Sequence, residues 1–367
     1  MSMYSIGNDL YTGKRTLDIV GRRKMWFSVA IFFVLASIAS FLIREPNLGI
    51  EFRGGSQFTV SDTSTTDHQP AYDVIAEFSD SVPRVSNVGQ SSVRVQTEEL
   101  GDEATQDARR ALADAYDVSE SEVTSTFIGP SWGQDVLAQA IQAMIIFMIA
   151  ISIVLMAYFR SWTIAVGALG ALVHDFVVTL GVYWVLGLEI TPATVIGLLT
   201  IMGYSLYDTV VVFDKVRENT SELTEQYDRT YAEESNLAIN QTLIRSLNTS
   251  ITGLLPLMAV LVIGVWLLGA DTLRDLSLVM FVGMFLSAIS SIFVAAPSAV
   301  ALAERSPEIQ AHTQEILDRR QDNPDPQPDT DEKTDVPSGN ISTEPVAGGH
   351  RGQSAQPKRH KKKRKNR

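Results

Sequence analysis

The chain has 367 residues and a formal net charge of −12, and 45% of its residues are hydrophobic. It contains no cysteine, which excludes a disulfide framework, a thiolate metal site and a thiol nucleophile. Very apolar stretches alternate with very polar ones, a pattern typical of a chain that lies partly in a membrane and partly in water.

Six stretches are long enough to cross a bilayer, for which a helix needs about 20 predominantly apolar residues. They predict membrane spans at 25–43, 137–159, 163–186, 192–213, 250–269 and 276–303. The first follows a basic segment at 1–24 and ends at Arg44-Glu45-Pro46 without a small-residue cleavage site. We therefore expect an anchor and not a removable signal peptide.

Basic residues indicate the orientation of these spans. They gather in segment 1–24, at Lys215 and Arg217 after the fourth span, and in the last ten residues. Six spans place all three groups on one side, and the positive-inside rule makes that side the cytoplasm. The termini are then cytoplasmic and segment 44–136 is extracytoplasmic. The start of the fifth span is the least defined boundary, because an amphipathic helix from about Leu237 would also fit the interface.

The segment 44–136 has the pattern of a small folded domain of about 75 residues. We expect strands at 57–60, 84–88, 92–96 and 123–128 and helices at 71–78 and 103–116. This βαββαβ order predicts an α+β ferredoxin-like domain. The fold class is thus a polytopic α-helical membrane protein with six transmembrane helices, in which 137–303 forms the bundle of the second to sixth spans.

Local patterns support the elements of this domain. Residues 87–90 are predicted to form a hairpin turn between the second and third strands. Asp102 is predicted to cap the second helix, whose apolar stripe consists of Ala108, Leu112 and Ala115. His68 is interpreted as a solvated loop histidine, because the domain shows no metal-ligand spacing and His68 stands alone in it. We expect no metal, no cofactor and no enzymatic site.

Ionisable side chains inside a span are costly, so they mark functional sites that face the protein interior. Asp208 lies about two turns from the cytoplasmic end of the fourth span, on the helix face of Tyr204 and Ser205. Depth counting at about 1.5 Å per residue puts Arg245 of the fifth span at the same level, so we expect the two to meet. Arg245 belongs to a polar stripe at helical spacing, formed by Gln241, Arg245, Asn248, Thr249 and Thr252.

His174 and Asp175 lie halfway across the third span. The small residues of this span permit close helix approach: Gly167, Gly170, Ala171 and Gly181. For Asp208 and Arg245 two interpretations remain open, a protonatable carboxylate gated by a cation in a wet pathway, or a permanent ion pair that fixes helix register. For His174 and Asp175 the structural alternative is one hydrogen bond to a neighbouring helix.

At these residues the chain resembles the SecD/SecF family of bacterial protein-export membrane proteins, within the resistance-nodulation-division superfamily, and its SecF branch in particular. The most specific match is Gly203 to Asn219, which includes Asp208, Asp214, Arg217, Glu218 and Asn219. Further matches are Asn240 to Ser250, Glu51-Phe52-Arg53-Gly54-Gly55, Gly129-Pro130 with Gly133, and His174-Asp175. The family commonly has Asn at the position of Tyr207, whose bulk puts the local water path in doubt.

The resemblance covers residues 15–303 and implies a function. It implies an auxiliary subunit of the Sec machinery in the bacterial plasma membrane, which uses the proton motive force for late steps of preprotein translocation. Implied partners are a SecD-like subunit, the SecY/SecE/SecG channel and translocating preproteins. A half-transporter for a lipid or small molecule is the alternative, although it would need a larger outer domain with an apolar cleft. A scaffold without proton coupling would tolerate Asp208→Asn.

The tail at 304–367 is predicted to be disordered, because it is rich in Asp, Gln, Pro, Ser and Gly and poor in large apolar residues. It ends in the polybasic segment 358–367, which is typical of contact with anionic lipids or with ribosomal RNA.

Overall fold

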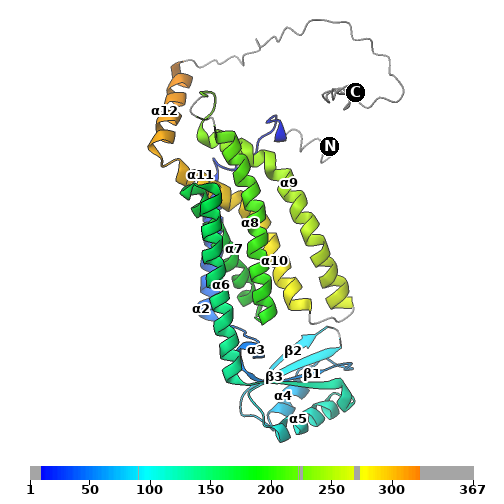
Figure 1. The fold of residues 1–367 in the computed structure, drawn as a ribbon. Coiled ribbons are helices and arrows are strands. Elements are labelled where there is room, and N and C mark those ends of the chain that lie inside the picture. The colour runs from blue at the N-terminus through cyan, green and yellow to red at the C-terminus, as the bar shows by residue number, and fades with distance from the viewer. Residues whose placement is uncertain (1–9, 90, 222, 224–225, 268–272, 323–367) are drawn as a thin grey trace, which may run out of the picture. The chain divides into compact units, whose positions relative to one another are not determined.

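The computed structural model describes residues 10–89, 91–221, 223, 226–267 and 273–322 (Figure 1). Six of its helical segments are long and apolar enough to cross a membrane, as predicted. They are α2 (Arg23–Ile43), α6 (Pro130–Phe159), α7 (Trp162–Leu186), α8 (Pro192–Thr220), α9 (Tyr231–Ala259) with the π-helical η3 (Val260–Leu267), and α10 (Arg274–Ser290) with the π-helical η5 (Ser291–Ala295) and α11 (Ala296–Ala303).

Several of these helices extend beyond the apolar runs that predicted them. Helix α6 begins at Pro130 and α8 continues to Thr220, because backbone hydrogen bonding continues in water where the apolar run stops. Helix α9 begins at Tyr231, where Thr230 and Glu233 form a capping box. The fifth span is therefore one continuous helix from Tyr231, and no separate interfacial helix begins near Leu237.

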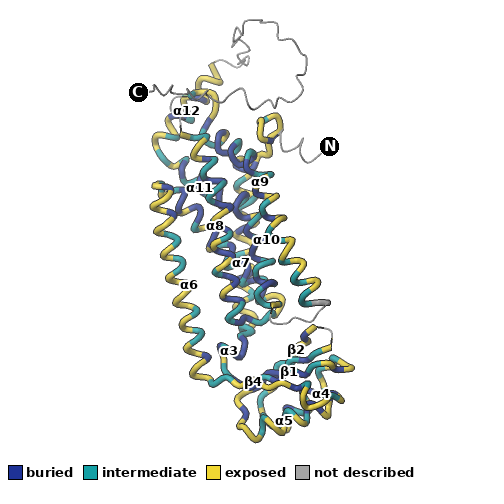
Figure 2. Tube along the Cα trace, turned by 45° about the vertical axis from the view of Figure 1, so that its right-hand side comes forward, coloured by how far each residue is buried: buried dark blue, intermediate teal, exposed yellow. Residues whose placement is uncertain are grey.

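Within their most apolar stretches, α7, α8 and the sixth helix have the largest buried shares of the six, whereas α2, α6 and the fifth helix have the smallest; Figure 2 shows the contrast between α7 and α6. Small residues permit the close packing, as predicted for the third span. A Cβ atom on Gly167 would lie 2.9 Å from the Cβ of Ala299, so the backbones of α7 and α11 meet there. Gly170 differs, because a Cβ atom at this position would have no neighbour within 4 Å.

Residues 55–128 form the predicted ferredoxin-like domain, here called the sheet domain. Its four strands are β1 (Gly55–Val60), β2 (Arg84–Val88), β3 (Ser92–Thr97) and β4 (Val123–Ile128), in the order β2-β3-β1-β4 with every pair antiparallel. Helices α4 (Gln69–Ile75) and α5 (Asp102–Ala115) connect them. The core joins alternate strand residues such as Phe58 and Val95 to Ile75 of α4 and Leu112 of α5.

Two local predictions for the sheet domain were wrong. Asp102 is the first residue of α5, and Gly101 precedes it without a side-chain capping bond. Ala115 is exposed, whereas Tyr116 is buried and donates a hydrogen bond to the carbonyl of Asp67 (2.7 Å). The buried face recurs at Ala108, Leu112 and Tyr116 because four residues make slightly more than one helical turn. His68 pairs with Asn87 (2.7 Å), and the predicted hairpin turn includes Gln90, which lies outside the described residues.

Two glycine-containing linkers join the sheet domain to the bundle. The first contains the short helix α3 (Ile50–Arg53) and Gly54, and the second consists of Gly129 and the first turn of α6, which contains Pro130 and Gly133. The linkers touch, because a Cβ atom on Gly54 would lie 2.6 Å from the Cα of Pro130 and one on Gly133 would lie 3.0 Å from the nitrogen of Gly54. Gly54 also has φ +77°, which favours glycine.

The predicted disorder of the tail is wrong for its first part, where helix α12 (Pro307–Asp322) forms. His312 and Ile316 are buried on one face of α12. His312 Nε2 lies 2.8 Å from the carbonyl oxygen of Gln226, in the loop between α8 and α9, and Arg319 stacks on the ring of Tyr227. The average composition of the whole tail does not predict α12, since a short helix needs only one face of correctly spaced apolar residues. The polybasic end lies outside the described residues.

Candidate functional site

Asp208 lies on α8 in the interior of the bundle, 5% exposed. Ser291, at the first position of η5, donates a hydrogen bond to Asp208 Oδ2 (2.7 Å), and Ser246 of α9 donates to the same oxygen. Within the described residues both hydrogen bonds to this carboxyl group reach Oδ2. Two donors on one oxygen suit an ionised carboxylate, and they leave Oδ1 as the atom that can take a proton.

A second carboxyl group is connected to the first through α8. Ser205, one turn before Asp208, donates a hydrogen bond to Asp175 Oδ2 of α7 (2.9 Å). His174 Nδ1 lies 3.1 Å from Asp175 Oδ1, and its Nε2 is buried with no hydrogen-bond partner among the described residues. The predicted residues of the third and fourth spans therefore form one polar cluster, here called the Asp175–Asp208 cluster.

Arg245 does not take part in this cluster. It is exposed on α9, while its neighbour Ser246 is buried against Asp208. Successive residues of an α-helix point about 100° apart, so a shift of one residue decides which side chain faces inward. The expected contact between Arg245 and Asp208 is absent from the part of the chain that the structure describes.

The rest of the predicted polar stripe of α9 is divided between two faces. Tyr204 donates a hydrogen bond to the carbonyl of Thr249 (3.1 Å), which ties α8 to α9. Gln241 accepts a hydrogen bond from Asn219 (3.2 Å) at the end of the bundle opposite the sheet domain. Asn248 and Thr252 are exposed like Arg245. A polar face on a membrane helix requires water or another protein chain against it.

Tyr207 is 56% exposed, so its side chain points away from the Asp175–Asp208 cluster. The phenol therefore does not fill the space between the two carboxyl groups. The substitution of the usual Asn by Tyr changes the surface of α8 and leaves the interior polar residues in place.

The sequence prediction missed Ser246 and Ser291. Hydroxyl side chains are common in membrane helices, where they bond to their own backbone, so a single serine is a weak signal. A stronger signal was available in the sixth span, where serines recur at helical spacing. These residues are Ser287, Ser290 and Ser291, and all three are buried.

The remaining residues of the fourth-span match lie at the end of α8 opposite the sheet domain. Asp214 accepts a hydrogen bond from the Tyr158 hydroxyl of α6 (3.0 Å), and Asn219 donates to Gln241 of α9. Glu218 pairs with Lys215 (2.8 Å), and Arg217 is exposed. These residues fix the helix end and lie apart from the two carboxyl groups.

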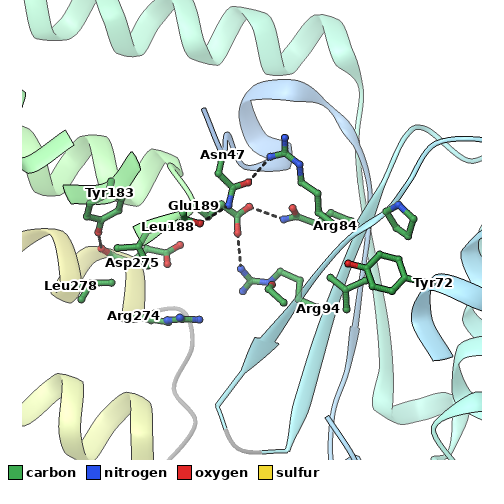
Figure 3. A pocket seen from close by; sticks show the side chains of 15 residues that line it. Asn47, Tyr72, Arg84, Arg94, Tyr183, Leu188, Glu189, Arg274, Asp275 and Leu278 are labelled. Carbon is green, nitrogen blue, oxygen red and sulfur yellow. Dashed lines mark hydrogen bonds and ion pairs between the residues drawn. The ribbon is translucent and has the colours of Figure 1, made fainter. Parts of the chain in front are cut away.

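The other end of α8 is joined to the sheet domain (Figure 3). Glu189, in the loop between α7 and α8, accepts hydrogen bonds from Arg94 (3.2 Å) and Gln96 (2.6 Å) of β3. Asn47 extends the contact, since its carbonyl oxygen accepts a hydrogen bond from the Ile190 nitrogen (2.8 Å). These residues border a pocket of about 370 Å³. Movement of the α7–α8 loop is thereby coupled to β3.

Glu51 lies beside this contact, and one of its carboxyl oxygens is buried without a hydrogen-bond partner. Burial raises the pKa of the Glu51 carboxyl, a backbone hydrogen bond lowers it, and the negative charge of Glu189 raises it further. Its neighbour Phe52 is buried among apolar residues at this end of the bundle, including Tyr183 and Ile190. Within the described ranges, no group of three or more Asp, Glu or His is placed to hold a metal ion.

Comparison with known proteins gives two family matches. Residues 108–305 match the family described as "Protein export membrane protein SecD/SecF, C-terminal", and residues 39–61 match the "SecD/SecF GG Motif". The chain belongs to the SecD/SecF family. The second match includes Gly54 and Gly55, so the SecD/SecF glycine motif coincides with the linker that packs against Pro130.

SecF subunits are similar to the chain over most of its length. The protein translocase subunit SecF of Mycobacterium tuberculosis is 40% identical over 328 residues, covering 86% of this chain and 74% of that protein. SecF of Streptomyces coelicolor is 39% identical, with 86% and 84% covered. The crystal structure of SecDF from Thermus thermophilus, "a translocon-associated membrane protein", matches with a TM-score of 0.70 and 29% identity over 79% of this chain and 39% of that one.

Proposed function

We propose that this chain is the SecF-type subunit of the bacterial Sec protein-export machinery, and that it uses the proton motive force with a SecD-like partner to drive late steps of preprotein translocation. The supporting observation is the buried Asp175–Asp208 cluster, because an intramembrane carboxyl group such as Asp208, which accepts hydrogen bonds from two serine hydroxyls, can gain and lose a proton. The relatives that are similar over most of the chain are named protein translocase subunits.

The energy scale of a proton step suits this role. One elementary charge that crosses 100 mV supplies about 2.3 kcal/mol, which biases a two-state equilibrium by roughly fiftyfold. In the proposed cycle, protonation at Oδ1 of Asp208 weakens the pull of the carboxylate on Ser246 and Ser291. The helices that these serines occupy are then free to change their packing against α8.

The contact of Glu189 with β3 connects this change in helix packing to the sheet domain. Thr191, two residues after Glu189, caps α8 and donates a hydrogen bond to Asp275 (3.2 Å) at the start of α10. A tilt of α8 or α10 therefore displaces the loop that binds Arg94 and Gln96. We propose that the sheet domain is the lever that acts on the preprotein outside the membrane.

The exposed face of α9 supports a second membrane subunit as partner. Arg245, Asn248 and Thr252 face outward from this chain, and a SecD-like half would cover them. The SecDF structure is a longer chain of which this one covers 39%, and we propose that a SecD-like half corresponds to part of the rest. Further proposed partners are the SecY/SecE/SecG channel and translocating preproteins. The proposed orientation has both termini in the cytoplasm and the polybasic end near anionic lipids or the ribosome.

The proposal is tested by proton-gradient-dependent release of a secreted protein from membrane vesicles. We expect Asp208→Asn to reduce release at least tenfold, because an amide cannot take up a proton, while the variant still inserts and copurifies with its partner. Asp135→Asn, an exposed carboxyl group on α6, is the matched control and should behave like the wild type. Undiminished release by Asp208→Asn would refute proton coupling through this residue.

A further inference from the structure

The sixth membrane helix is interrupted by a π-helical turn at the residue that contacts Asp208. Helix α10 ends at Ser290, the turn η5 spans Ser291–Ala295, and α11 follows with Pro297 in its first turn. Proline has no N–H group, so the Phe293 carbonyl four residues earlier lacks its usual donor, and the ring crowds that carbonyl. A π-turn relieves such a conflict by widening the helix, and such turns occur often at functional sites.

The π-turn changes which residues face the interior. Before the turn the buried residues follow α-helical spacing and end with Ser290, Ser291 and Ile292; after it they resume at Ala295, Ala296 and Pro297. The two groups are five residues apart, whereas about 3.6 residues complete an α-helical turn. The turn therefore lets Ser291 face Asp208 while the alanines of α11 still pack against α7, where Gly167 meets Ala299.

The hydroxyl of Ser291 has one hydrogen and two acceptors within reach. Its Oγ lies 2.7 Å from Asp208 Oδ2 and 3.3 Å from the carbonyl oxygen of Ala288 in its own helix, and Ser291 is fully buried. A hydrogen bond to an ionised acceptor is about twice as strong as one to a neutral acceptor. The hydroxyl therefore bonds to Asp208 while that group is ionised. When Asp208 is neutral, this difference in hydrogen-bond strength is lost. The Ala288 carbonyl then competes for the hydroxyl hydrogen, as backbone carbonyls do for serines in helices generally.

We propose that Ser291 is a positioning residue that holds Asp208 in its ionised state and is released when Asp208 takes up a proton, so that the π-turn converts protonation into a movement of the sixth helix. This inference rests on the proposed function and names the element that responds to the proton. In the proton step, a hydronium ion from the outer solution gives its proton to Asp208 Oδ1. One O–H bond forms there as the hydronium O–H bond breaks, and no other covalent bond changes.

The other groups around Asp208 are compatible with this assignment. From α7, the titratable groups near the cluster are Asp175 and His174, and they reach Asp208 only through Ser205. From α8 the phenol Tyr204 lies one turn away and bonds to Thr249. From α9 the facing side chain is the neutral Ser246, since Arg245 points outward. In the described part of the sixth helix, η5 and its neighbour α11 present no charged group to Asp208.

The test compares the pH dependence of proton-driven release for variants of the full chain assembled with its partner. For Ser291→Ala we expect the midpoint of the pH profile to move by about one unit toward alkaline pH, a tenfold change in proton concentration, because the ionised form has lost a donor. The matched control is Ser298→Ala, whose hydroxyl bonds to the Val294 carbonyl in the same helix. Its profile should coincide with that of the wild type.

Two further variants distinguish the loss of this hydrogen bond from a folding defect. Ser291→Cys keeps the size of the side chain but is a weak donor, so its midpoint should move in the same direction by less. Pro297→Ala permits a regular α-helix, and combined with Ser291→Ala it should add no further shift if both act through one hydrogen bond. A wild-type profile for Ser291→Ala and Ser291→Cys, with Asp208→Asn inactive, overturns this inference alone. Full release by Asp208→Asn overturns the proposed function as well.

Discussion

The carboxyl group of Glu51 lies where the first linker meets the bundle, within reach of the charges of Glu189 and Asp275. Its pKa is raised in the folded protein, chiefly by burial. Between the model-compound value of 4.5 and the raised folded value, the folded state binds more protons than the unfolded state. Stability therefore falls as pH rises through this window, and the loss persists above it.

We expect Glu51→Gln to remove this loss of folding stability at high pH. The variant should be more stable than the wild type at pH 8 by about 1 °C in thermal midpoint, a small effect because the group is partly solvated, and the difference should shrink toward pH 4. Thermal unfolding of the detergent-solubilised protein at the two pH values measures it. Glu99→Gln, an exposed carboxyl group after β3, is the control, and a gain for Glu51→Gln that is equal at both pH values would contradict the burial argument.

The residues of the Asp175–Asp208 cluster show what sequence can predict about a membrane site. The cost of burying ionisable groups identified Asp208, His174 and Asp175, helical spacing added Ser205, and the structure places these four together. The partner of Asp208 was not predictable in the same way. Depth along a helix follows from residue counting, but its rotation depends on packing against neighbours, and one residue of rotation exchanges Arg245 for Ser246.

At the level of elements, the loop between α7 and α8 connects the membrane helices to the sheet. Glu189→Ala removes the carboxylate that accepts hydrogen bonds from Arg94 and Gln96. We expect proton-driven release to fall several-fold while membrane insertion is unchanged, because the link between α8 and β3 is broken. The control is Glu45→Ala, an exposed carboxyl group at the end of the first span. Wild-type release by Glu189→Ala would show that the loop does not transmit movement.

Helix α12 offers a second test at this level. Ile316 is fully buried and Leu317 is 41% exposed, so the two neighbouring residues form a matched pair. Truncating a buried isoleucine costs about 2–5 kcal/mol. We expect Ile316→Ala to detach α12 and expose it to limited proteolysis, whereas Leu317→Ala leaves the digestion pattern unchanged. Equal resistance of the two variants would show that Ile316 does not hold α12.

The elements were predictable to different degrees. Apolar length fixes a membrane helix, and alternation with turn residues fixes a strand, so the six helices and the order of the sheet-domain strands followed from local sequence. The π-turn at η5 and helix α12 did not. Pro297 indicates a break in the sixth helix, but the form of the break depends on how Ala299 packs against Gly167 of α7. Helix α12 depends on contacts with the loop at Gln226 and Tyr227, which no local pattern of the tail contains.

At the level of the whole molecule, the polar face of α9 is the surface that we propose another subunit covers. We expect Arg245→Met to abolish proton-driven release. The variant should still copurify with its SecD-like partner, because it loses only one charge from a large helix contact. Arg160→Met, an exposed cation between α6 and α7, is the control. Retention of full activity by Arg245→Met would show that this cation is not needed for proton-driven release.

Helix α8 is fastened near both ends, by Glu189 and Thr191 beside the sheet domain and by Asp214 and Asn219 at the opposite end. A rod pinned at its two ends can twist or lean but cannot slide along its length. Asp208 itself then travels only a short way through the electric field of the membrane. Electrical recordings of the working complex should therefore register the passage of hydrogen ions, with little displacement current from the protein's own charge.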